Sequence, residues 1–135
     1  MKNLSMLLSF GSILFAGHLL AQGPSFTVQN NTNCQYDIQA EAHTNGSCTP
    51  NGNVGTAFAC TAQGQCTIAF PTSCAAPTTC ETLRFRIKET GTLAWSNWAG
   101  NDATCTPPLP NNVTFNTTCG TVTLTWTSST TGVVN

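Results

Sequence analysis

The chain has 135 residues, of which 7% are charged and 40% hydrophobic, and its formal net charge at pH 7 is −1. A chain of this length suits one domain and leaves no room for two. Since phosphate binding needs a basic surface, this composition argues against nucleic acid as a partner.

The first 21 residues have the order of a secretory signal peptide. Lys2 is followed by an apolar stretch over residues 4–20 and then by Ala21, after which we place the cleavage; a cut after Gly23 is the alternative. We favour a cleaved leader over a membrane anchor, because a span needs roughly 20 apolar residues and polar residues interrupt this one. The expected product is a secreted, extracellular or cell-surface protein with no membrane span after signal cleavage. It is a single disulfide-stapled β domain over residues 22–135.

Eight cysteines lie downstream of the leader, which contains none, and they mark an oxidised, disulfide-bonded domain. They are Cys34, Cys48, Cys60, Cys66, Cys74, Cys80, Cys105 and Cys119. Of the 105 pairings that eight cysteines allow, proximity favours Cys60 with Cys66 and Cys74 with Cys80. Cys34 with Cys48 and Cys105 with Cys119 follow by elimination, although either pair could cross to the other. A metal site is disfavoured, because the cysteine spacings contain no C-x-x-C motif.

The sequence between the cysteines alternates apolar and polar residues with the period of half-buried β-strands. Strands are predicted over residues 25–29, 36–43, 67–70, 82–89, 92–98, 112–117 and 121–127. Residues 44–56, 71–79 and 99–110 are rich in Gly, Pro, Asn, Thr and Ser and are predicted to be loops. Seven or eight short strands without a helical period predict an all-β fold: a small disulfide-rich antiparallel β-sandwich, Ig-like or thaumatin-like in general architecture, or failing that a small barrel.

One segment carries a family resemblance. Phe26-Thr-Val28-Gln-Asn30 through Cys34-Gln-Tyr36-Asp-Ile38 resembles the first strands of thaumatin-like proteins, which form a disulfide-rich β-sandwich. The resemblance covers residues 26–38 only. The rest of the chain lacks the further cysteines of that family and the acidic cluster that lines its cleft, so the resemblance implies an architecture and no function.

The mature chain has little that could support catalysis. His43 is its only histidine, and Asp37 and Glu41 would stand about 13 Å apart along a strand, beyond the roughly 5 to 9.5 Å between glycosidase carboxyls. Glu41 could pair with Glu81 or Asp102 only if the fold brings them together. We expect no enzymatic activity and no cofactor. A metal ion held by Asp37, Glu41 and His43 is disfavoured against a solvated strand face, because the set offers too few ligands.

The cations of the mature chain form one candidate ligand site. Arg84, Arg86 and Lys88 alternate along the strand predicted at 82–89 and therefore share one face. They could bind an anionic ligand such as an acidic polysaccharide. The alternative, which we favour, is that they pair across strands with Asp37 and Glu41.

Tryptophans suggest a second candidate site. Trp98 leads into a loop with Asn101 and Asp102, where an indole beside amide and carboxylate groups would suit a sugar ring. The alternative is a tryptophan folded back over the edge of the core. Trp95 shares a strand face with Leu93 and is predicted to lie in the core.

These observations favour a non-catalytic extracellular binding or adhesion module, with glycans or other cell-surface or matrix components as its ligand. A self-assembling structural protein is the first alternative, suggested by the low charge and by Thr-rich faces such as the row at residues 121, 123, 125 and 127. That row is also typical of ice- or polymer-binding faces, although β-propensity explains it more simply. The second alternative is a secreted inhibitor or effector that presents a disulfide-bounded loop, such as 75–79 or 106–110.

Overall fold

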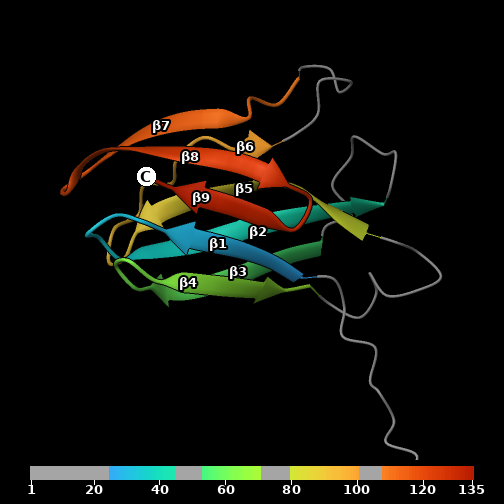
Figure 1. Cartoon of the computed structure of the whole chain (residues 1–135), viewed down its shortest axis with the longest axis horizontal. Coiled ribbons are helices and arrows are strands. Elements are labelled where there is room, and N and C mark those ends of the chain that lie inside the picture. The colour runs from blue at the N-terminus through green and yellow to red at the C-terminus, as the bar shows by residue number, and fades with distance from the viewer. Residues whose placement is uncertain (1–24, 45–52, 71–79, 101–107) are drawn as a thin grey trace, which may run out of the picture.

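The computed structural model describes residues 25–44, 53–70, 80–100 and 108–135, which form two packed β-sheets (Figure 1). The strands are β1 (Ser25–Asn30), β2 (Tyr36–Thr44), β3 (Asn53–Cys60), β4 (Gln65–Ala69), β5 (Cys80–Glu89), β6 (Ala99–Gly100), β7 (Asn112–Thr117), β8 (Gly120–Ser128) and β9 (Thr131–Val134). One sheet has the order β4-β1-β9-β8-β7 and the other β3-β2-β5-β6. The predicted all-β sandwich is confirmed, whereas the proposed signal peptide lies outside the described residues.

The core lies between the two sheets and is built from the alternating apolar residues of both. Phe26 on β1 and Phe85 on β5 are fully buried, and their ring centroids lie 5.3 Å apart. Other fully or almost fully buried side chains are Val28, Tyr36, Ile38, Ala40, Ile68, Ile87, Val122, Leu124 and Val134. The period-two pattern therefore assigns the inner faces of β1, β2, β5 and β8 correctly.

Gly132 on β9 lies directly against this aromatic pair. A Cβ atom at this position would stand 2.9 Å from Cζ of Phe85 and 3.0 Å from Cζ of Phe26. We expect Gly132→Ala to lower the free energy of unfolding by about 1 to 3 kcal/mol, because an added methyl overpacks a closed core. Urea unfolding measures this, with the neighbouring exposed Thr131→Ala as the control. Equal stability of the two variants would mean that the rings move aside at no cost.

Four predictions about individual segments are wrong. β3 begins at Asn53 inside the predicted 44–56 loop, β6 lies inside the predicted 99–110 loop, and β9 is a strand that the pattern does not predict. β9 is held by a parallel pairing with β1 and an antiparallel pairing with β8. Residues 92–98 do not form the predicted strand. The reason lies in how Ser96 pairs with Ile87. The Ser96 N–H donates to the Ile87 carbonyl at 2.7 Å, as in a sheet. The Ile87 N–H, however, donates to the Ser96 hydroxyl at 3.0 Å and not to its backbone carbonyl, so the regular strand pairing stops here.

Two disulfides lie within the described residues. Cys60–Cys66, with a Cα–Cα distance of 5.7 Å, forms as predicted and bridges the β3–β4 turn, where the chain passes from the four-stranded to the five-stranded sheet. Cys34 bonds to Cys119, with a Cα–Cα distance of 6.0 Å, so the predicted pairs Cys34–Cys48 and Cys105–Cys119 are wrong. This bond joins the β1–β2 connection to the β7–β8 turn. The other predicted pair is Cys74–Cys80, of which Cys74 lies outside the described residues.

The disulfides indicate an oxidising environment of the extracellular type. Within the described ranges, no helix is long and apolar enough to cross a membrane.

Candidate functional site

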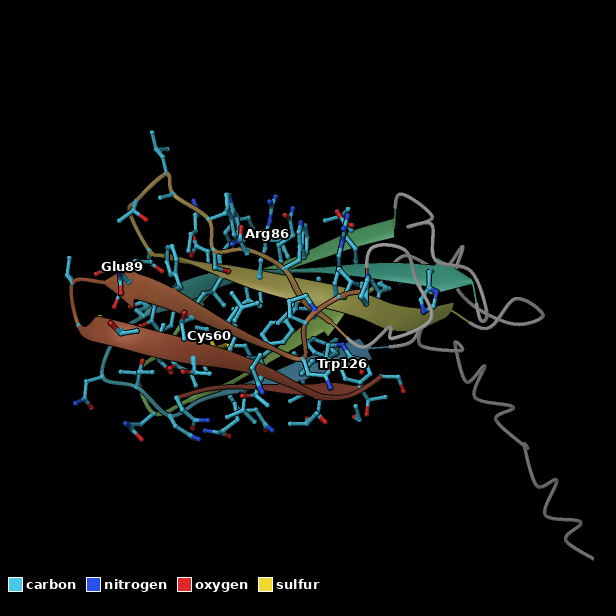
Figure 2. The ribbon with its side chains drawn as sticks, turned by 90° about the horizontal axis from the view of Figure 1, so that it is seen from above. Cys60, Arg86, Glu89 and Trp126 are labelled. Atoms are coloured by element: carbon cyan, nitrogen blue, oxygen red, sulfur yellow. A yellow bond between two sulfur atoms is a disulfide. The ribbon has the colours of Figure 1, made fainter. Side chains whose placement is uncertain are left out.

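The outer face of the four-stranded sheet carries the predicted cation stripe. β5 alternates so that Phe85 and Ile87 enter the core while Arg84, Arg86 and Lys88 point away from it. Figure 2 shows Arg86 on this outer side, away from the five-stranded sheet. The predicted common face of the three cations is therefore present.

Two tryptophans alternate with these cations. The Trp98 ring lies under the guanidinium groups of Arg84 and Arg86, with Cζ 4.5 and 4.4 Å from the ring centroid. The Trp95 ring contacts Arg86 Cζ at 4.8 Å and Lys88 Nζ at 5.4 Å. These distances are within the cation–π range of about 6 Å. We call these five residues the cation–tryptophan ridge.

The segment after β5 positions both indoles. The paired Ser96 and Ile87 hold residues 95–98 alongside β5, and Ser96 is 5% exposed. The chain then enters β6, where Ala99 pairs with Phe85 and is fully buried. Trp95 and Trp98, three residues apart, consequently share Arg86 and together contact all three cations.

Two of the three cations are neutralised by neighbouring carboxylates. On β2, Glu41 lies opposite Arg84 with a closest N–O distance of 2.7 Å, and Asp37 lies opposite Lys88 at 3.3 Å. The prediction of cross-strand pairing is confirmed for these two cations. The paired groups also argue against the metal-ion alternative, because both carboxylates already have cationic partners.

Arg86 differs from its neighbours. The residue opposite it on β2 is Gln39, whose Oε1 accepts a hydrogen bond from Arg86 Nε at 2.8 Å. An amide carries no charge, so Arg86 has no carboxylate partner among the described residues. It is thus an uncompensated cation at the centre of the ridge, enclosed by two indole rings.

Asp37 is the most constrained of the charged residues on this face. It is 6% exposed and accepts hydrogen bonds from the Ala59 N–H and the Thr90 hydroxyl, both at 3.0 Å. Burial alone would raise its pKa, but these two bonds and Lys88 outweigh it and hold the pKa below 3.8. Asp37 is therefore ionised near neutral pH and acts as a structural anchor for the edge strand β3.

The structure corrects the predicted role of Trp95. This residue is half-buried on the outer face and not in the core, and Leu93 is 94% exposed. Trp98 is also half-buried, and the guanidinium groups of Arg84 and Arg86 lie against its ring. Asn101 and Asp102 lie outside the described residues. The sequence analysis does not identify Trp95 and Gln39 as parts of this site. Gln39 could have been identified, because it alternates with Asp37 and Glu41 on the outward face of the same strand.

The opposite face of the sandwich has a different character. The strands of the five-stranded sheet contain no charged residue, and their outward positions are mostly Thr, Asn and Gln. The threonine row predicted on β8 meets Thr131 on the neighbouring β9, whose hydroxyl lies 2.7 Å from that of Thr127. Farther across the sheet, the hydroxyls of Thr27 on β1 and Thr67 on β4 are hydrogen-bonded at 3.3 Å. The charged side chains that the structure describes lie instead on the four-stranded sheet.

Comparison with known proteins adds no assignment: no protein-family model, no curated protein and no solved structure matches this chain.

Proposed function

We propose that this protein is a secreted, non-catalytic extracellular binding module that binds acidic glycans through the cation–tryptophan ridge. The observation that supports this most directly is Arg86, the central cation of the ridge, which has two indole rings around it and no carboxylate opposite. Its flanking cations are paired with Glu41 and Asp37. A ligand that brings a carboxylate or sulfate would complete the pairing on this face.

The Arg86 guanidinium at the centre of the ridge is also preorganised for such a ligand. Packing between Trp95 and Trp98 and the bond to Gln39 fix the orientation of the Arg86 guanidinium, so little side-chain entropy is lost on binding. A planar guanidinium donates two parallel hydrogen bonds to a carboxylate or sulfate. The covered indole faces favour an anionic group at Arg86 over a sugar ring stacked on Trp98.

Replacing Arg86 tests this function. We expect Arg86→Gln to weaken binding to polygalacturonate or dextran sulfate about tenfold, because a charge-assisted bidentate pair is lost and tenfold corresponds to about 1.4 kcal/mol. Affinity measured by biolayer interferometry at low and physiological salt gives the result. The matched control is Thr114→Glu, which lowers the net charge by the same amount on the other sheet and should change affinity less than about twofold.

Two results would contradict the proposal. The first is that the wild-type protein binds neither polymer. The second is that Arg86→Gln and Thr114→Glu lose the same amount of affinity, which would mean that net charge alone explains the effect.

A self-assembling structural role is the second candidate. The edge strands β3 and β4 lie side by side and contain no charged residue that would disfavour pairing with the edge of another molecule. In addition, Phe58 on β3 is 74% exposed. This role would be supported if light scattering of the wild-type protein increases with concentration and the increase is smaller in Phe58→Lys. Of the loops considered for an inhibitor, residues 75–79 and 106–107 lie outside the described residues.

A further inference from the structure

A recess opens at one end of the sandwich, next to the Lys88 end of the ridge, where Lys88 Nζ donates to the Thr92 carbonyl at 3.3 Å. Its volume is about 290 Å³, and its lining comes from the end of β5, the loop that follows, the second half of β7 and the β7–β8 turn. The lining residues are Glu89, Thr92, Ala94, Phe115, Asn116, Thr117 and Thr118. Figure 2 shows Glu89 at this end of the strands and Arg86 farther along the outer face.

The floor of the recess is apolar. Phe115 faces inward on β7 in register with the buried Val113, and it packs against the core. β7 is the edge strand of its sheet, so no further strand covers this side of Phe115, and the ring remains partly exposed. Ala94 and the threonine methyl groups supply further apolar surface.

The recess carries one fixed negative charge. The Thr118 hydroxyl donates to Oε1 of Glu89, and the Thr118 N–H donates to Oε2 at 3.0 Å. These two bonds lower the pKa of Glu89 below its ordinary value, the hydroxyl bond contributing most. A carboxylate has about four lone-pair sites, so Glu89 can accept further donors.

Among the residues that the structure describes, Glu89 also has no cationic partner. The lining of the recess contains no Lys, Arg or His. Asp37 and Glu41 are paired with Lys88 and Arg84, whereas no ion pair involves Glu89 among the described residues. A single carboxylate above an apolar, aromatic floor suits a ligand with one positive charge on an apolar stem.

We propose that this recess binds a primary alkylammonium group, with the ammonium on the Glu89 carboxylate and the methylene chain along Phe115. Two sources share this chemistry: the side chain of a lysine in a partner polypeptide and a free diamine. The site adjoins the ridge at Lys88 but does not include Arg86, and it takes a ligand of opposite charge. Its test therefore does not depend on the acidic-glycan function.

Titration of the full oxidised domain with two probes, followed by ¹H–¹⁵N NMR, tests this proposal. The probes are cadaverine and Nα-acetyl-lysine methylamide, with Nε-acetylated lysine methylamide as the uncharged control. We expect saturable shifts confined to residues 89–94 and 115–118, with a dissociation constant on the order of 1 mM for such a small contact. Binding of the lysine probe alone identifies a polypeptide source, and binding of cadaverine alone identifies a diamine.

Variants separate binding from folding. We expect Glu89→Gln to weaken binding at least fivefold, whereas Glu41→Gln, which removes a carboxylate from the other face, leaves it unchanged. Glu89→Gln also removes an acceptor for Thr118 and so affects the turn. Asn116→Asp keeps Glu89 and adds a second carboxylate at the rim, and it should therefore increase the affinity for the amine probes two- to fivefold. No shifts with either charged probe, equal shifts with the acetylated control, or no gain in Asn116→Asp would overturn the proposal.

Discussion

Replacing both Cys34 and Cys119 with alanine should lower the free energy of unfolding by about 4 to 5 kcal/mol. The bond closes a loop with a sequence separation of 85 residues, and the loss of chain entropy in the unfolded state grows with loop length. It also ties the connection between the two sheets to the β7–β8 turn. Because small domains have net stabilities of about 5 to 15 kcal/mol, this one bond accounts for a large share.

The second described disulfide provides the control. Cys60–Cys66 closes a loop with a sequence separation of only 6, for which the same entropy argument gives about 2 kcal/mol. Urea unfolding of the two double-alanine variants should therefore rank Cys34–Cys119 well above Cys60–Cys66. If the two losses are equal, or the order is reversed, loop entropy does not control the stability of this domain.

The Cys34–Cys119 bond illustrates what sequence proximity cannot predict. The favoured pairing of near neighbours is right for Cys60–Cys66, because the short β3–β4 turn keeps these two residues close in space as well as in sequence. Cys34 follows β1 and Cys119 precedes β8, and these strands are separated by only β9 in one sheet. Their proximity depends on the sheet order, which includes the unpredicted strand β9 and its parallel pairing with β1.

The ridge shows a similar limit. Alternation in β5 predicted the common face of Arg84, Arg86 and Lys88 correctly, because a side-chain period of two is a local property. The same rule applied to residues 92–98 placed Trp95 and Trp98 on opposite faces. It failed there because the Ser96 hydroxyl replaces a backbone acceptor for Ile87, which ends the regular ladder. Side-chain hydrogen bonds of this kind compete with sheet pairing and leave no periodic signal.

Asp37→Ala should lower the free energy of unfolding by about 2 to 4 kcal/mol, because it removes the acceptor for several donors at once. The Ala59 N–H and the Thr90 hydroxyl would lose their partner, and Lys88 would lose its counter-ion. Ala59 has a φ of 54°, a left-handed conformation that is unfavourable for alanine and that the bond to Asp37 helps to hold. Glu41→Ala, which breaks the more exposed pair with Arg84, should cost less than about 1 kcal/mol.

The pH dependence provides an independent test of the same anchor. The folded-state pKa of Asp37 is lowered, because its hydrogen bonds and Lys88 together outweigh the opposing effect of burial. Its charge therefore contributes stability that is present above the unfolded pKa, near 3.8, and is lost as the pH falls through the lower folded value. The stability difference between wild type and Asp37→Asn should be constant above about pH 5 and should narrow at more acidic pH. A difference that stays constant down to about pH 2 would show that the hydrogen bonds to Asp37 matter and its charge does not.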